Sequence, residues 1–518
     1  MGISRTISRR TAVKVMGGSL AASVMALAGC GASTSSDGAV TTDAAPAPSS
    51  KTLTIGETSM IDSVSPMESG NPWSLTSDGI SESVYMQDAE GKLYSNYIEE
   101  LRQDDDLTWT ATVKQGMKFS DETDVDAKAL ADCLNLIQES NPLSNSTAGK
   151  CTFTANEDGS LKIQTGIKCA AMDSFLCEWS NIVFKKVDDT TFVFSGPYKI
   201  DDLNPGVELT LSPNPGYPDA DRRPKITIKA FGDTTAMQQA YESGEIDMAF
   251  TVTPDVKATL EGEGHKTISF DAGYQYMGYV NTKSAALSDV KVRQAISYAL
   301  NRDDMVTALK GGEVATGVFA HYYSFAGDNK PEFDTAKAES LLDEAGWAKG
   351  ADGTRAKDGQ KLSVRLVTYA SRPDLPVVMQ LAASQLKQVG IDATTEIVDA
   401  IDDAGKSGSF DIMFYAQHTA PTGNPVSFLA MTFKTGGAKD FTGYSSPDFD
   451  ALVTEMSGLP NGEQLDELAK QAQNLLYQDL PVLYLVDPTW YAAVSDDLAD
   501  YKPYCGDYYV VNAELGLD

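Results

Sequence analysis

Short apolar strands separated by one-sided helices constrain the fold of this chain more than any other feature. In "RRPKITIKAFGDTTAMQQAYESGEIDMAF" (222–250), alternating apolar residues predict a strand over 226–230 and a helix over 234–243. Gly244 ends the predicted helix, and a second strand is predicted over 246–250. A helix between two short apolar strands is typical of α/β proteins.

Similar units follow along the chain. A strand is predicted over 109–113 and a helix after it, capped by Thr123 or Asp124. Further one-sided helices are predicted in "DVKVRQAISYALNRDDMV" and in "FDTAKAESLLDEAGW", the latter capped by Asp334 or Thr335.

A second α/β region begins where Leu362, Val364 and Leu366 alternate. A helix over 378–389 and a strand over 410–415 complete it, and the apolar "PVLYLVDP" predicts a late strand returning to the first region. Because residues 275–330 separate the two regions, the sequence predicts two α/β lobes.

Composition bounds the function classes. The 518 residues are 42% hydrophobic, which is enough for two or three domains with their own cores. The net charge of −32 gives a surface that repels phosphate backbones, so nucleic-acid binding is disfavoured.

The N-terminus has the pattern of an export signal. Residues 1–14 are basic, residues 15–29 are apolar and small, and "LAGC" ends at Cys30. "SRRTAVK" resembles a twin-arginine signal, and "LAGC" resembles a bacterial lipobox. We therefore expect a signal peptide over 1–29, a lipid on Cys30 and a flexible tether over 30–50.

The other cysteines give only weak evidence for disulfides or metal binding. The remaining cysteines are Cys133, Cys151, Cys169, Cys177 and Cys505; their number is odd and no CxxC pair exists. Spacing makes Cys133 a small buried hydrophobe, whereas Cys169 and Cys177 are compatible with a disulfide.

No catalytic motif is visible. HExxH, GxSxG, P-loop and GxGxxG patterns do not occur, and the three histidines, His265, His321 and His418, lie far apart in sequence. We expect His265 at the surface and His321 packed and hydrogen-bonded. A binding protein rather than an enzyme is the favoured interpretation; a secreted hydrolase is the remote alternative, since two carboxylates suffice for glycoside hydrolysis.

Seven segments form an ordered series along the chain: "FSDETDVDAKALADCLN" (119–135), "SGPYKI" (195–200), "NPGYPDADRRPKITIKAF" (214–231), "AYESGEIDMA" (240–249), "GYVNTKSAALSDVKVRQAISYALNRDDMV" (278–306), "FDTAKAESLLDEAGW" (333–347) and "PTGNPVSFL" (421–429). In this order they resemble the family 5 extracellular solute-binding proteins, the peptide/nickel receptors of ABC importers. The resemblance implies an α/β, two-lobed periplasmic-binding-protein-like fold of type II, with an extra subdomain in the first lobe and a hinge between the lobes.

The same resemblance implies domain boundaries and partners. The first lobe is expected over 51–275, the second over 276–484, and a return to the first over 485–518. The chain is expected to be a monomer outside the cytoplasmic membrane, held there by its lipid. It would close around a small solute and deliver it to a separate ABC permease with ATPase subunits.

A cleft receptor needs aromatic surface and a few orienting polar groups. In "MFYAQHTAPTGNPVSFL" (413–429) we expect a loop that presents His418 and Asn424 to the cleft. The candidate ligand-binding residues are Trp73, Tyr274, Tyr276, Arg372, His418, Asn424 and Trp490.

Two solute classes stay open. Peptide-binding relatives place an aspartate in the loop that corresponds to 417–425, and this chain has none there, which puts dipeptide capture in doubt. The resemblance is closer to the metal-chelate branch, in which Arg372 would hold an anionic chelate and His418 would be a single metal ligand. No resident cofactor is expected, and a short peptide without metal is the alternative.

Overall fold

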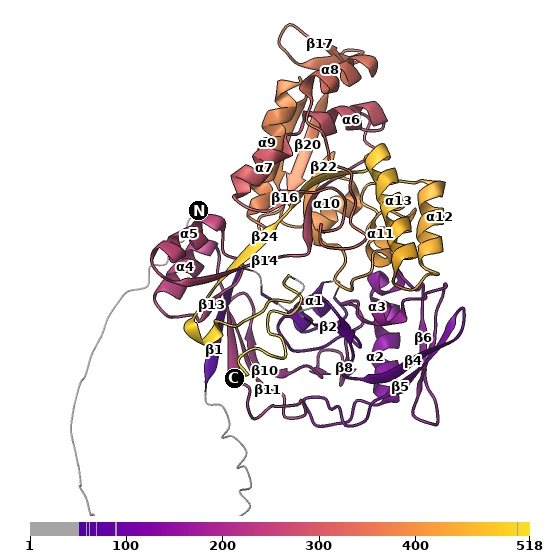
Figure 1. Cartoon of the computed structure of the whole chain (residues 1–518), viewed down its shortest axis with the longest axis vertical. Helices are drawn as coiled ribbons and strands as arrows, with labels where there is room; N and C mark the ends of the chain where they lie inside the picture. Colours follow the sequence, from indigo (N-terminus) through magenta and orange to yellow (C-terminus); the bar gives the residue numbers. More distant parts are fainter. Residues whose placement is uncertain are drawn as a thin grey trace, which may run out of the picture. The chain divides into compact units, whose positions relative to one another are not determined.

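The computed structural model describes residues 51–518, apart from residues 59, 62, 69, 89, 90, 505 and 518. The predictions for the signal peptide, Cys30, the tether and Cys505 therefore lie outside the described residues. Two large sheets organise the described part of the chain, and β24 runs between the parts that contain them (Figure 1).

The first sheet has seven strands and contains the predicted strand at 226–230. Its order is β10 (Tyr198–Asn204), β11 (Glu208–Pro213), β12 (Lys225–Ala230), β1 (Thr52–Glu57), β13 (Met248–Ala249), β24 (Thr489–Val494) and β14 (Lys266–Asp271). Strand β1 pairs in parallel with both β12 and β13. The parallel pairs and the α4 helix between β12 and β13 confirm the α/β interpretation, although β13 is shorter than the predicted 246–250.

The second sheet has six strands. Its order is β16 (Glu313–Val314), β23 (Val482–Asp487), β15 (Tyr274–Val280), β22 (Ile412–His418), β20 (Ser363–Thr368) and β21 (Asp392–Ile397). The prediction that "PVLYLVDP" returns to the first region is wrong, because β23 pairs with β15 and β16 in this sheet. The strand that enters the first sheet is β24, which pairs with β13 and β14.

Smaller sheets and helices complete the elements. The small sheets are β4 (Ile98–Asp105), β5 (Thr108–Val113), β7 (Leu161–Gln164) and β6 (Thr152–Ala155); β2 (Met86–Gln87) and β3 (Leu93–Tyr94); β8 (Phe184–Lys186) and β9 (Phe192–Phe194); and β17 (Ala348–Lys349), β18 (Arg355–Lys357) and β19 (Gln360–Lys361). The α-helices are α1 (Asn71–Ser77), α2 (Ala127–Ser140), α3 (Met172–Leu176), α4 (Thr234–Glu242), α5 (Pro254–Gly262), α6 (Val290–Ala299), α7 (Arg302–Leu309), α8 (Thr335–Glu344), α9 (Asp374–Gln388), α10 (Ile401–Ser407), α11 (Val426–Thr432), α12 (Pro447–Met456) and α13 (Glu463–Asp479). Short 3₁₀ helices lie at Pro142–Asn145 and Asp496–Leu498.

The structure confirms one of the two predicted helix caps. Asp334 caps α8 by accepting a hydrogen bond from the Lys337 N–H at 2.9 Å, as predicted. The predicted cap of α2 is wrong: Asp126 caps it, accepting from the Ala129 N–H at 2.8 Å. The Thr123 hydroxyl donates to Asp121 instead, and Asp124 pairs with Lys118 at 2.7 Å.

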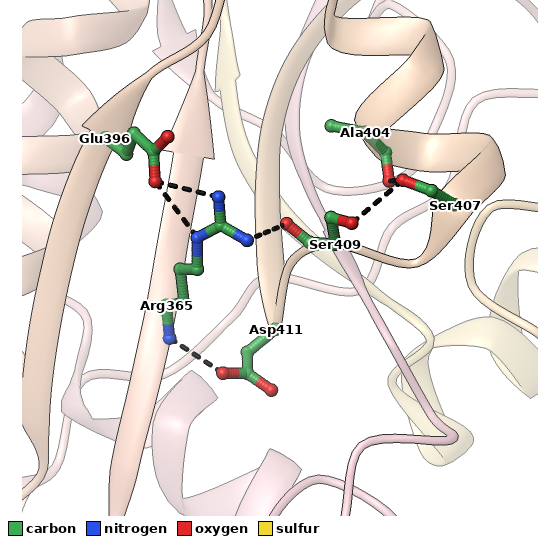
Figure 2. Close-up of polar contacts among 6 residues, drawn as sticks. All are labelled: Arg365, Glu396, Ala404, Ser407, Ser409 and Asp411. Carbon is green, nitrogen blue, oxygen red and sulfur yellow. Dashed lines mark hydrogen bonds and ion pairs between the residues drawn. The ribbon is translucent and has the colours of Figure 1, made fainter.

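Polar contacts at one end of the second sheet hold β22 against β20. The Arg365 guanidinium on β20 donates to Glu396 on β21 at 2.8 Å and to the Ser409 carbonyl at 2.6 Å (Figure 2). The Arg365 backbone N–H donates to the Asp411 carboxylate at 2.8 Å (Figure 2). These contacts fix the start of β22, whose other end is His418.

The four described cysteines are buried and form no disulfide. Cys169 and Cys177 are therefore not bridged to each other, and neither are Cys133 and Cys151. Cys133 lies on the inner face of α2 and is 2% exposed, which confirms the prediction of a small buried hydrophobe.

Candidate functional site

A cavity of about 390 Å³ is lined by residues from both large sheets and from the C-terminal coil. Cavities of this size accommodate small molecules. The first sheet and the adjoining α1 helix contribute Glu57, Trp73, Asp78 and Phe250. The second sheet and its loops contribute Tyr274, Arg372, Tyr415 and His418, and the C-terminal coil contributes Asp507 and Tyr508.

Strand register brings Tyr274 and His418 together. They are opposite partners at the end of the antiparallel β15–β22 pair, so their side chains are cross-strand neighbours. Their rings meet edge-on at 5.6 Å, and the Tyr508 ring lies 5.0 Å from the imidazole. Gly273 has φ +70°, and a Cβ there would collide with the imidazole, so this position requires glycine.

The His418 imidazole is neutral and buried. Burial lowers its pKa to about 3, and its side chain is 3% exposed. Neither ring nitrogen has a hydrogen-bond partner among the described residues. The expectation of a loop position is wrong: His418 is the last residue of β22, because its pairing with Tyr274 extends the strand beyond the predicted residue 415.

The Arg372 guanidinium is paired with a carboxylate of the protein itself, so it is not available for an anionic solute. Its guanidinium donates to Asp507 at 2.6 Å and lies over the rings of Tyr274 at 4.9 Å and Trp490 at 4.6 Å. The Tyr274 hydroxyl donates to the same Asp507 carboxylate at 2.7 Å. This cluster ties the second sheet to the C-terminal coil and already balances the Arg372 charge.

Lys439, a second cation in the cavity wall, is also paired with a carboxylate. Lys439 lies 3.7 Å from Asp402, and the Tyr415 hydroxyl donates to that carboxylate at 2.8 Å. The cavity therefore presents two internally paired cation–carboxylate sets.

The cavity residues contributed by β1 and α1 include polar atoms that lack partners among the described residues. Glu57 Oε1, Trp73 Nε1 and Asp78 Oδ2 are buried and make no hydrogen bond within the described ranges. Burial, followed by the negative charges of Asp78 and Asp507, raises the pKa of Glu57 well above its usual value. Burial raises the pKa of Asp78 to about 7.

The candidate residues from the sequence fall into three places. Trp73, Tyr274, Arg372 and His418 line the main cavity. Tyr276 and Trp490 line a smaller neighbouring cavity, where the Tyr276 hydroxyl donates to Asp374 at 2.8 Å. The contact of these six with a solute stays a prediction.

Asn424 lies apart from the main cavity and builds the turn before α11. Its side-chain Nδ2 donates to the Asn461 Oδ1 at 2.7 Å, and its side-chain Oδ1 accepts from the Val426 N–H at 2.9 Å. It lines two minor cavities. These contacts give Asn424 a structural role in the turn.

The sequence interpretation missed most of the lining residues, among them Glu57, Asp78, Asp507 and Tyr508. One signal was available for Glu57, because it ends an apolar strand, and ligands in α/β sheets bind beyond the carboxyl ends of strands. The acid-free loop at 417–425 is correctly identified, but other segments bring carboxylates to the cavity. The inference against peptides from that loop is therefore weakened.

His321 lies outside the main cavity. The His321 Nδ1 lies 2.8 Å from the Asp487 carboxylate, so His321 is hydrogen-bonded as expected. The expectation that it is packed is wrong, because its side chain is 44% exposed. No group of three or more His, Cys, Asp or Glu side chains in the described ranges is arranged to hold a metal ion. In the same residues, every helix is too short or too polar to cross a membrane.

The fold has two large sheets with a cavity lined by residues of both. Residues 92–440 match the family described as bacterial extracellular solute-binding proteins, family 5 Middle. The match covers more than half of the sequence, so the chain belongs to this family.

Three known proteins illustrate the similarity. The oligopeptide-binding protein AppA of Bacillus subtilis is 29% identical over 60% of this chain and 59% of AppA, so the alignment spans less than two thirds of that relative. The glutathione-binding protein GsiB of Escherichia coli is 26% identical over 77% of this chain and 81% of GsiB. NikA of Staphylococcus aureus, solved in complex with Ni(L-His)2, superimposes with a TM-score of 0.79 at 20% identity, over 89% of this chain and 98% of NikA. The described elements thus have the two-lobed family fold, which confirms the predicted fold class.

Proposed function

We propose that this chain is the solute receptor of an ABC importer. It captures a small solute outside the cell in the cavity between its lobes and delivers it to a permease, and it carries out no chemistry. One observation supports this role above the others: the walls of the cavity hold buried polar atoms of Glu57, Trp73, Asp78 and His418 that find no partner in the described chain. Buried polar groups are nearly always paired, so these atoms are poised for a solute.

The solute classes are a metal chelate and a short peptide. The named relatives bind oligopeptides and glutathione, and the structural neighbour holds a nickel–histidine complex. A bare metal ion is disfavoured because the described residues offer no cluster of ligands. The neutral imidazole of His418 supports the chelate class, since it needs no deprotonation to coordinate a metal.

We expect native mass spectrometry of the protein purified from its own host to reveal one bound small molecule per chain. Metal analysis of the same sample separates the two classes: nickel or cobalt at one equivalent supports a chelate, whereas a metal-free peptide ladder rejects it.

If a chelate is bound, His418→Ala should weaken the affinity for that chelate at least about tenfold. His265→Ala is the matched control, because His265 packs on Tyr241 away from the cavity. Unchanged affinity in His418→Ala would remove His418 from the site.

We further propose that a lipid on Cys30 anchors the chain to the outer face of the cytoplasmic membrane, where the chain works as a monomer. Its first lobe spans 51–275, its second lobe spans 276–484, and residues 485–518 return to the first lobe. Cys30→Ala should abolish lipid attachment and release the protein into the soluble extracytoplasmic fraction. Cell fractionation with globomycin treatment checks this. Processing unaffected by globomycin, or a membrane-bound Cys30→Ala variant, would contradict the anchor.

A further inference from the structure

Two buried carboxylates lie in the wall formed by the first sheet. Glu57 is the last residue of β1, between the parallel neighbours β12 and β13, and Asp78 is the C-cap residue of α1. Their exposures are 8% and 3%, and both line the main cavity. Glu57 thus occupies the carboxyl end of a parallel strand, where α/β sheets bind ligands.

These two carboxylates lack the counter-charges that the other charged groups of the cavity have. Arg372 is bonded to Asp507 at 2.6 Å, and Lys439 lies 3.7 Å from Asp402. Glu57 Oε1 and Asp78 Oδ2, by contrast, have neither a hydrogen-bond donor nor an ion-pair partner in the described part of the chain. Buried carboxylates without a partner are strongly destabilising, so their retention at a cavity wall indicates a ligand that completes them.

We propose, on the basis of the solute-receptor function above, that Glu57 and Asp78 form a subsite for a protonated amine of the solute. An ammonium group has three N–H donors and no acceptor, so it can donate to Glu57 Oε1 and Asp78 Oδ2 at the same time. The subsite is built from Glu57 at the end of β1 and Asp78 at the end of α1, and His418 of the second sheet lines the same cavity. Solute recognition by charge is therefore assigned to the first lobe.

The electrostatics of the empty site agree with an amine. Burial and the neighbouring charges of Asp78 and Asp507 raise the pKa of Glu57, and Arg372 opposes that rise only in part. Burial therefore favours a proton on the empty pair, and a bound ammonium would displace that proton as both carboxylates ionise. An anionic solute group would gain nothing here. A divalent metal needs more ligands than the two carboxylates, and the described residues supply no third.

The first test blocks the amine chemically and requires no variant. The small-molecule fraction is released from the purified protein by denaturation, and half of it is acetylated with N-hydroxysuccinimidyl acetate, which converts amines to neutral amides. Rebinding of each half to refolded apo-protein is measured by thermal shift. We expect acetylation to abolish the stabilisation given by the untreated fraction. Fragmentation of the acetylated molecule distinguishes a peptide α-amine from a side-chain or polyamine nitrogen.

The second test uses isosteric variants. Glu57→Gln and Asp78→Asn should each weaken binding of the untreated fraction about 10- to 100-fold. Glu178→Gln is the matched control: Glu178 is also a buried acid, but the Thr147 and Ser427 hydroxyls already hydrogen-bond to it, and it lies outside the main cavity. We expect Glu178→Gln to bind as the wild type does.

The outcomes separate the subsite from the receptor function. Rebinding that survives acetylation, or unchanged affinity in both carboxylate variants, overturns the amine subsite while the receptor role stands. A wild-type protein that neither retains nor rebinds any small molecule contradicts both.

Discussion

Arg372→Ala should lower the stability of the folded protein by about 3 to 5 kcal/mol, because it leaves the buried Asp507 carboxylate without its cation. The substitution also removes the guanidinium that lies over Tyr274 and Trp490. Because the cluster joins the second sheet to the C-terminal coil, the walls of the cavity should loosen with it. Differential scanning calorimetry of the solute-free protein measures the effect as a fall in Tm.

Arg365→Ala is the matched control for this prediction. Arg365 is also paired with a carboxylate on the second sheet, that of Glu396 (Figure 2). Both of these side chains are about half exposed. An exposed pair of this kind contributes no more than about 1 kcal/mol. The double variant Arg372→Met with Asp507→Asn should recover much of the lost stability, since it buries no uncompensated charge. A fall in Tm no larger for Arg372→Ala than for Arg365→Ala would contradict the prediction.

Local sequence signals predicted much of the fold because strands and helices are specified by neighbouring residues. The β12–α4–β13 unit and the Asp334 cap of α8 are close to their predicted positions. The errors lie where pairing between distant strands decides the length or position of a strand. Pairing with Tyr274 extends β22 to His418, and β23, which was expected in the first sheet, pairs with β15 in the second. Such long-range pairs leave no periodic pattern in the sequence.

The cavity was less predictable than the fold. Trp73, Tyr274 and His418 stood out as large side chains in suitable segments. Glu57 and Asp78 did not stand out, because the sequence has 73 acidic residues. Only their burial distinguishes these two from exposed acidic residues, and burial is visible in the structure alone. Asp507 lies in a coil segment without hydrophobic periodicity, so only the folded chain brings it to Arg372.

Asp78→Asn should stabilise the solute-free protein, and increasingly so as the pH rises from about 4 to about 7. The pKa of Asp78 is raised to about 7 by burial, against an ordinary value of 3.8. Below about pH 4 the carboxyl is protonated in both folded and unfolded chains, so the substitution changes little. Above that pH the Asp78 carboxyl ionises in the unfolded chain but stays protonated in the folded chain. The stability of the wild type therefore falls until the folded carboxyl also ionises, near pH 7. The gain in Asp78→Asn should reach on the order of 2 to 4 kcal/mol at pH 8.

Calorimetric Tm values of solute-free wild type and Asp78→Asn at pH 5 and pH 8 measure this difference. Asp132→Asn is the control, because Asp132 is an exposed α2 residue paired with Lys128, and its removal should shift Tm little at either pH. An Asp78→Asn variant no more stable than wild type at pH 8 would show that this carboxylate is not strained in the empty cavity. If the gain is observed together with weaker binding of the amine-bearing fraction, the same charge destabilises the empty receptor and holds the solute. Such an exchange of stability for binding is expected of a residue kept for function.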